Sequence, residues 1–171
     1  MKSAENRLRY RSDQAKNLVS FLVGDVRYAV DIHRVREIVN PLPMVALPHA
    51  PPEVIGVTDH RGDVLPIVDL RVRFGTSTRE TTRRTKWIIV RVPGTEQSFA
   101  LVVDAVNAVF GASKEDQRPA PELGRGEDLR GIDHVYAHDG TLVFVVDPQV
   151  VTSAAQQIDP KTLPPLLRGG P

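Results

Sequence analysis

The sequence contains no cysteine and no long apolar run. Without cysteine, disulfide bonds, thiolate catalysis and cysteine-ligated metals are excluded. Every apolar stretch is shorter than the roughly 20 residues that a membrane-spanning helix needs. The first 17 residues alternate charged and small side chains and contain no apolar stretch of the signal-peptide type. We therefore expect a cytoplasmic protein without direct membrane insertion.

The sequence also lacks a strong charge of either sign and has few aromatic residues. Its 171 residues include 22 Lys and Arg and 21 Asp and Glu, for a formal net charge of +1, and aromatic residues make up 5% of the chain. Nucleic-acid binders normally present a basic face, and single-strand binders add exposed rings on which bases stack. Basic side chains do gather around residues 75–85, where a solvated, charged loop is the simpler interpretation. We expect no nucleic-acid partner, and a small basic-loop barrel that binds nucleic acid stays as the alternative from a different class.

The apolar residues occur in short blocks separated by Gly, Pro and Asp, which is typical of strands and turns. These blocks predict hairpins at 18–23 with 26–32, at 54–58 with 64–70, at 87–92 with 99–106 and at 132–136 with 142–146. So many short strands with so few helices predict an all-β protein built as barrels or as a sandwich.

The spacing of apolar residues changes between residues 32 and 39. Ile32, Val35 and Val39 recur at intervals of three and four, which predicts a short helical turn. Residues 75–85 have no apolar anchor, and we interpret them as a loop that joins two halves of the fold. The expected organisation is a flexible N-terminal segment over residues 1–17, one domain over 18–151 with its junction near 75–85, and a C-terminal segment over 152–171. The Pro- and Gly-rich tail of that last segment is expected to be disordered.

One cluster has the residue types of an enzyme active site. Asp59, His60 and Asp63, followed by Asp69, place carboxylates around a histidine, as acid–base or metal-dependent catalysis requires. The cluster falls at a predicted hairpin tip, where turn geometry alone favours Asp, Gly and His. We therefore prefer the structural interpretation, and a metal-dependent hydrolase stays as an alternative. The sequence contains no nucleophile or phosphate-loop motif, and we predict no enzymatic activity, no metal and no cofactor.

The segment 54–70 reads VIGVTDHRGDVLPIVDL. It resembles the chemotaxis coupling protein CheW family, whose members carry a stretch of the form V-x-G-V-x-N-x-R-G-x-x-x-P-I-V-D-L. The likeness continues at residues 28–32, 101–104 and 118–122, and it extends from about residue 18 to residue 151. Its central block is specific enough to make chance a poor explanation.

The resemblance implies a fold and a role. The fold is two five-stranded, SH3-like β-barrels packed against each other, with short helical turns. The role is that of a non-enzymatic adaptor, which links the signalling tip of a methyl-accepting chemotaxis receptor to the regulatory domain of a CheA-type histidine kinase. A divergent scaffold of this family, which binds receptors without the kinase or serves another chemosensory pathway, is the closest alternative.

The resemblance also assigns site residues. Arg61 and Gly62 match the family's Arg-Gly pair at a hairpin tip, and an arginine fixed there offers a forked set of donors. Gly56 matches a position at which a small residue lets a partner helix approach. The receptor-binding positions so implied are Val35, Glu37, Ile38, Gly56, Arg61 and Gly62.

This chain departs from the family pattern just before the Arg-Gly pair. Asp59 and His60 replace the family's usual Asn followed by an apolar residue. Because this change lies beside the implied receptor site, we expect Asp59 and His60 to affect partner specificity.

Overall fold

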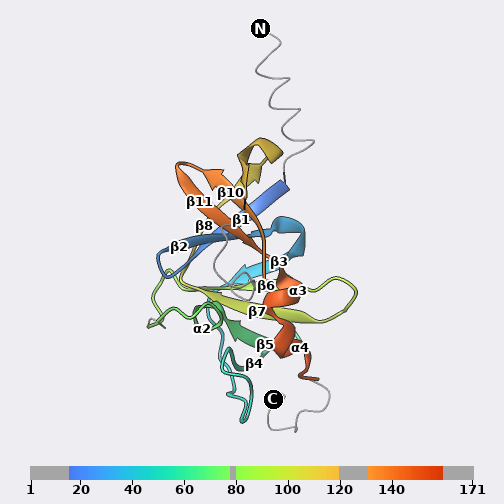
Figure 1. The fold of residues 1–171 in the computed structure, drawn as a ribbon. Coiled ribbons are helices and arrows are strands. Elements are labelled where there is room, and N and C mark those ends of the chain that lie inside the picture. The colour runs from blue at the N-terminus through green and yellow to red at the C-terminus, as the bar shows by residue number, and fades with distance from the viewer. Residues whose placement is uncertain (1–15, 78–79, 120–130, 160–171) are drawn as a thin grey trace.

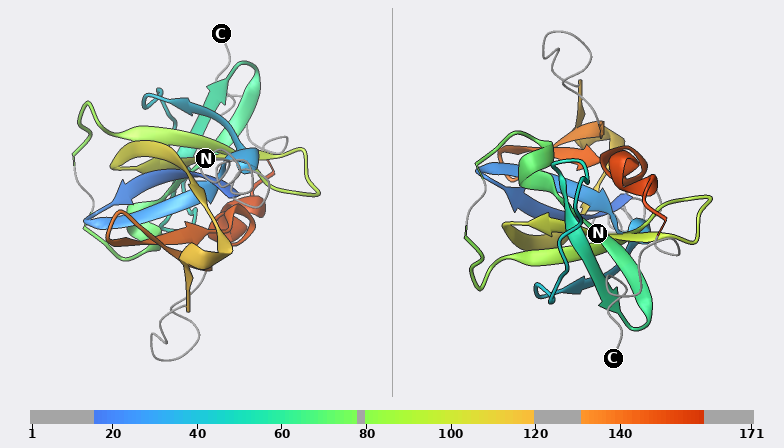
Figure 2. Two further views of the ribbon diagram at one scale, coloured as in Figure 1. Left: turned by 90° about the horizontal axis from the view of Figure 1, so that it is seen from above. Right: turned by 90° about the horizontal axis from the view of Figure 1, so that it is seen from below.

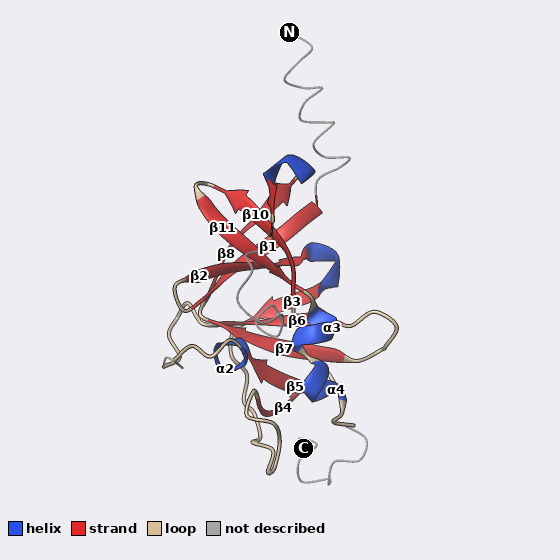
Figure 3. Cartoon of the chain, viewed as in Figure 1, coloured by secondary structure: helices blue, strands red, loops and turns tan. Residues whose placement is uncertain are grey.

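The structure is a computed structural model of the chain, and it describes residues 16–77, 80–119 and 131–159. Strands dominate these residues, and the helices among them are short (Figure 3). The all-β prediction is confirmed. In chain order the elements are β1 (Lys16–Val23), β2 (Val26–Asp31), η1 (Ile32–Arg34), β3 (Val35–Val39), β4 (Val54–His60), β5 (Asp63–Asp69), α2 (Leu70–Arg73), β6 (Lys86–Arg91), β7 (Ser98–Val103), β8 (Ala105–Ala112), η2 (Lys114–Asp116), β9 (Gln117–Arg118), β10 (Ile132–His138), β11 (Thr141–Val146), α3 (Pro148–Val151) and α4 (Ser153–Gln156).

The strands form two sheets, which occupy the upper and lower parts of Figure 1. Sheet A has six strands in the order β8-β1-β2-β11-β10-β9, and sheet B has five in the order β3-β6-β7-β5-β4. Two packed β units were predicted and are found. The prediction of five strands in each is wrong for sheet A, and neither backbone ladder closes into a barrel within the described residues.

The chain divides between the sheets differently from the sequence prediction. Sheet B takes the unbroken run from β3 to β7, whereas sheet A combines β1 and β2 with β8 to β11. Residues 75–85 therefore lie inside the run of sheet B and do not separate the two sheets. The reason is the parallel pairing of β5 with β7, in which Ile67 lies opposite Ala100. Parallel neighbours need a long crossover, and residues 75–85 with β6 supply it.

Strands β1, β5, β6 and β7 are buried on both faces over most of their length, which explains why they read as continuous apolar runs. In β6, Ile88 and Val90 face a core between the two sheets, while Trp87 and Ile89 face a second core inside sheet B. Every residue of β7 is buried. A third, smaller core lies inside sheet A around Leu18 and Tyr136.

Residues 32–39 form a helical turn only in part. The 3₁₀ turn η1 begins after Asp31, whose Oδ1 accepts a hydrogen bond of 2.9 Å from His33 N. Residues 35–39 form strand β3 rather than more helix, paired with β6 with a register shift between Val35 and Glu37. Val35 packs against the core between the sheets and Val39 against the core inside sheet B. This bulge produces the three-and-four spacing that resembles a helix.

The ordered part of the chain continues past the predicted boundary at residue 151. Val151 and Ala155 are buried in the core between the sheets, and α3 and α4 lie beside both sheets in the two views of Figure 2. At the other end, β1 begins at Lys16. The predicted N-terminal segment up to residue 15 and the tail from residue 160 lie outside the described residues. Of the helices that are described, none has the length and apolar character of a membrane span.

A buried ion-pair network ties the two sheets together. Arg71 Nε and Nη2 donate hydrogen bonds of 2.9 Å to the two carboxylate oxygens of Asp69, and Nη1 lies 3.4 Å from Asp104 Oδ1. These hydrogen bonds, above all those to Asp69, raise the pKa of Arg71. Asp104, the single residue between β7 and β8, also accepts a hydrogen bond of 2.7 Å from Gly24 N in the β1–β2 turn. The network therefore fixes the point at which the chain returns from sheet B to sheet A.

Candidate partner-binding site at the β4–β5 hairpin tip

The β4–β5 hairpin ends in a two-residue turn made by Arg61 and Gly62. Both residues have left-handed backbone angles, with φ of 54° and 84°, as a type I′ hairpin turn requires. For Arg61 this conformation costs about 1–2 kcal/mol. Asp59 Oδ1 offsets part of that cost by accepting a hydrogen bond of 3.0 Å from Gly62 N. Asp59 therefore shapes the turn that presents Arg61.

Glu37 of β3 joins the tip to the opposite side of sheet B. Its Oε2 lies 3.0 Å from His60 Nε2, and its Oε1 accepts a hydrogen bond of 3.1 Å from Arg61 Nη2. The hydrogen bond with His60, helped by the nearby charge of Arg61, lowers the pKa of Glu37. The His60 side chain is 18% exposed and that of Arg61 is 75% exposed. At the tip, the Glu37 carboxylate thus contacts the largely covered ring of His60 and the exposed guanidinium of Arg61.

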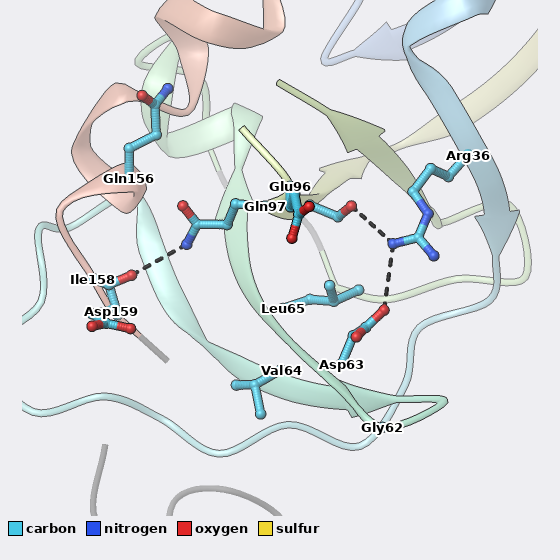
Figure 4. A pocket seen from close by; sticks show the side chains of 11 residues that line it. Arg36, Gly62, Asp63, Val64, Leu65, Glu96, Gln97, Gln156, Ile158 and Asp159 are labelled. Atoms are coloured by element: carbon cyan, nitrogen blue, oxygen red, sulfur yellow. Dashed lines mark hydrogen bonds and ion pairs between the residues drawn. The ribbon is translucent and has the colours of Figure 1, made fainter. Parts of the chain in front are cut away.

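A second link to the tip comes from Arg36, which the sequence did not indicate. Arg36 Nη1 donates a hydrogen bond of 2.9 Å to Ser98 Oγ and lies 3.6 Å from Asp63 Oδ2 (Figure 4). In a helical turn over residues 32–39, Arg36 would lie away from the apolar side formed by Ile32, Val35 and Val39 and would face solvent. The bulge between Val35 and Glu37 explains the difference, because it lets consecutive side chains of β3 both reach the hairpin.

These contacts join the two outer strands of sheet B. β3 and β4 stand at opposite ends of the strand order, yet Glu37 on β3 contacts His60 at the end of β4. Sheet B therefore curls so that side chains of its two outer strands meet. This contact gives the sheet a barrel-like shape, although its backbone ladder does not close.

Gly56 has a role within the fold itself. It is buried in β4, and a Cβ atom there would collide with the carbonyl oxygen of Val45 and lie 3.1 Å from its carbonyl carbon. Val45 and Val57 exchange two backbone hydrogen bonds of 2.9 Å. The close approach at Gly56 is thus made by the protein's own segment around Val45, and the approach of a partner helix there stays a prediction.

The remaining implied positions lie on β3. Val35 is half-buried and packs on the core between the sheets, whereas Ile38 is 39% exposed. The connecting segment that pairs with β4 also exposes apolar side chains, those of Met44 and Val45. Apolar surface is therefore available on β3 and beside β4, on the strands that flank the charged tip.

The structure brings together five of the eight predicted residues at one point. These are Glu37, Asp59, His60, Arg61 and Gly62. Asp69, by contrast, is buried at the far end of β5 in its pair with Arg71, so it takes no part in the tip. Asp59, His60 and Asp63 each contact a neighbouring protein group, and in residues 16–77, 80–119 and 131–159 no three His, Asp or Glu side chains are placed to hold a metal ion.

Comparison with known proteins supports the resemblance. The family profile of the CheW-like domain matches residues 17–156. The chain belongs to this family. The chemotaxis protein CheW of Rhizobium meliloti (strain 1021) is 34% identical to it over 142 residues, which cover 83% of this chain and 90% of that protein. The probable chemotaxis protein CheW of Rhizobium etli is 30% identical over 141 residues, covering 82% of this chain and 90% of that protein.

A solved structure of the family has the same fold. The crystal structure of the scaffolding protein TtCheW from Thermoanaerobacter tengcongensis superposes with a TM-score of 0.72 at 26% sequence identity, covering 81% of this chain and 88% of that one. The CheW-like arrangement of two β units therefore applies to this chain.

Proposed function

We propose that this CheW-family protein is a non-enzymatic scaffold that couples a chemotaxis receptor to a CheA-type histidine kinase. Family membership and the chemotaxis proteins among its relatives support the general role. The observation that carries the finer proposal is the convergence of Glu37, His60 and Arg61 at an exposed hairpin tip. We infer that this tip is the edge of the receptor-binding surface.

The tip offers what a receptor helix needs in a partner. Arg61 is fixed by its turn, and its guanidinium has several donors for a carboxylate or a carbonyl on a helix. Ile38 and Val35 on β3 supply apolar contacts of the kind that seat an amphipathic helix in a groove. Gly56 supports the surface indirectly, because it lets the segment around Val45 lie against β4.

Arg61→Ala tests the proposal directly. Arg61 is 75% exposed, and exposed ion pairs contribute about 0–1 kcal/mol to stability. We therefore expect the variant to lose much of its binding to a purified receptor signalling tip while its melting temperature and circular dichroism stay near those of the wild type. Arg91→Ala, which removes an exposed arginine at the end of β6, is the matched control and should bind normally.

A pull-down with the purified receptor tip and with the kinase regulatory domain gives the outcomes that would overturn the proposal. If the wild-type protein binds neither a receptor tip nor a kinase regulatory domain, the coupling function is wrong. If it binds the receptor and not the kinase, the protein is a scaffold of the divergent kind. Equal receptor binding by the Arg61→Ala and Arg91→Ala variants would remove the tip from the binding surface. A His60→Leu variant compared on several receptor tips tests whether this chain's departure from the family pattern selects among receptors, since loosening of the β3–β4 contact would weaken binding to all of them alike.

A further inference from the structure

The outgoing strand of the hairpin, β5, is paired with β7 only at the end far from the tip. The parallel ladder covers residues 67–69, although β5 itself begins at Asp63. Pro66 stands directly before the paired residues and has no N–H with which to extend the ladder. Over residues 63–66 the backbone pairing of β5 within the described structure is therefore with β4, which is itself an outer strand of sheet B.

A groove of about 600 Å³ opens where this pairing is missing (Figure 4). Residues 62–65 line one side of it, and residues 96–98, which lead into β7, line another. Because of this hollow, the end of the hairpin is not packed against the start of β7. Packing therefore does not fix the direction of the hairpin end on this side, and contacts between side chains have to do so.

Arg36 of β3 connects the hairpin end to β7. Its Nη1 donates a hydrogen bond of 2.9 Å to Ser98 Oγ and lies 3.6 Å from Asp63 Oδ2 (Figure 4). Asp63 directly follows the turn made by Arg61 and Gly62, and Ser98 is the first residue of β7. One guanidinium therefore links β5 to β7 in the region where their backbone ladder is absent.

Two consecutive residues of β3 thus hold the two strands of the hairpin end separately. Glu37 contacts His60 and Arg61 at the end of the incoming strand, and Arg36 contacts Asp63 at the start of the outgoing strand. Attachments on both sides of a two-residue turn fix its direction, whereas a single attachment leaves the turn free to swing about that contact. The direction matters because Arg61, which is 75% exposed, extends from this turn.

We propose that Arg36 is a positioning residue for the receptor-binding tip, which acts through Asp63 and Ser98 to fix the direction in which the turn presents Arg61. This inference rests on the proposed function and deepens it. Two consequences follow. In the free protein, loss of Arg36 makes the turn mobile. In binding, it lowers the affinity for the receptor, because only the fraction of molecules with a correctly directed tip can bind.

The first measurement is the backbone mobility of the turn in the full chain without a partner, by ¹⁵N relaxation. In the wild type we expect the amides of Arg61 and Gly62 to have order parameters near the rigid value of about 0.85, and in Arg36→Ala values below about 0.6. Asp63→Ala, which removes the other half of the contact, should give the same result. The control is Arg34→Ala, which removes an exposed arginine of η1 and should leave the wild-type values. Equal order parameters in the wild type and Arg36→Ala would overturn the proposal.

A charge exchange distinguishes loss of this contact from general loosening of the fold. Arg36→Glu alone brings two carboxylates together and should leave the turn at least as mobile as in Arg36→Ala. Adding Asp63→Arg restores a pair of opposite charges, and Ser98 Oγ can donate to the new carboxylate, so the order parameters should return toward the rigid value. No recovery in the double variant would contradict the role of the contact. The side chains of Arg36 and Asp63 are 33% and 62% exposed, so the melting temperatures should stay near that of the wild type.

The second measurement is the dissociation constant for the purified receptor signalling tip. If the turn of Arg36→Ala has the binding direction for about a fifth of the time, the dissociation constant rises about fivefold. The same substitution in the Arg61→Ala background should have little further effect, because the side chain that Arg36 positions is then absent. An equal loss in both backgrounds would overturn the positioning role, since Arg36 would then contact the receptor itself. A wild-type protein that binds no receptor tip would contradict the proposed function, and the order parameters would still decide whether Arg36 fixes the turn.

Discussion

Replacing Gly56 with alanine separates the two roles considered for this residue. The added Cβ collides with the carbonyl oxygen of Val45, so either β4 or the segment around Val45 has to move. The neighbouring atoms are backbone rather than the tip of a flexible side chain, and backbone yields less readily. The substitution therefore acts on the fold itself, before any partner is present.

The magnitude follows from two contributions. Val45 and Val57 exchange two hydrogen bonds of 2.9 Å, and the net contribution of each such bond is about 1 kcal/mol. Forcing a methyl group into a packed site costs a further 1–3 kcal/mol, roughly. If the segment moves away far enough to relieve the collision, it loses the hydrogen bonds, so the two contributions partly replace each other. We expect Gly56→Ala to destabilise the protein by about 2–4 kcal/mol.

Urea unfolding followed by circular dichroism measures this difference. The matched control is Gly94→Ala, at a turn glycine with φ of 77° and no atom within 4 Å of the added Cβ. It should cost only the strain of a left-handed alanine, about 1–2 kcal/mol. A Gly56→Ala protein as stable as the wild type that no longer binds the receptor tip would refute our reasoning. That result would return Gly56 to the direct partner contact that the resemblance implied.

Two further substitutions test the charged networks. Asp69→Asn removes the carboxylate that accepts two hydrogen bonds from the buried Arg71 guanidinium, and Asp104 then remains as a carboxylate partner. It should cost up to about 3–5 kcal/mol in urea unfolding, the range for a buried ion pair broken on one side, unlike Asp139→Asn at a side chain that is 81% exposed. Glu37→Gln tests how the stability of the protein falls at acid pH. Because the pKa of Glu37 is lowered in the folded protein, its carboxylate stabilises the fold above the unfolded carboxyl pKa, and this stabilisation is lost as pH falls through the folded pKa. The stability difference between wild type and Glu37→Gln should therefore shrink on acidification, and a constant difference from neutral pH to pH 3, roughly, would contradict it.

The hairpins could be predicted from the sequence because their signals are local. Asp139-Gly140 and Arg61-Gly62 mark two-residue turns, and both turns have the left-handed backbone angles that such loops need. Apolar blocks on each side of these turns predict paired strands, and β4–β5 and β10–β11 pair as predicted. The hairpin tip as a place of interest was likewise visible, since its residues are consecutive in the chain.

The arrangement of the hairpins could not be predicted in the same way, because it depends on contacts between distant residues. The parallel pairing of β5 with β7 cannot be recognised from the local spacing of apolar residues. Because of this pairing, residues 75–85 connect strands of one sheet. The bulge in β3 imitates helical spacing. The link from Arg36 to Asp63 and Ser98 joins three strands and follows only once their register is known.

The hairpin tip serves the fold and the proposed binding surface with the same residues, and burial decides which role each substitution affects. His60 is 18% exposed and bonds to Glu37 across the outer strands. Its removal therefore loosens the contact that joins β3 to β4, and any change in binding is mixed with a change in the sheet. Arg61 uses the same carboxylate and is 75% exposed, so most of its surface is available to a partner. Arg61 is consequently the residue at which binding can be changed while the curl of sheet B is kept.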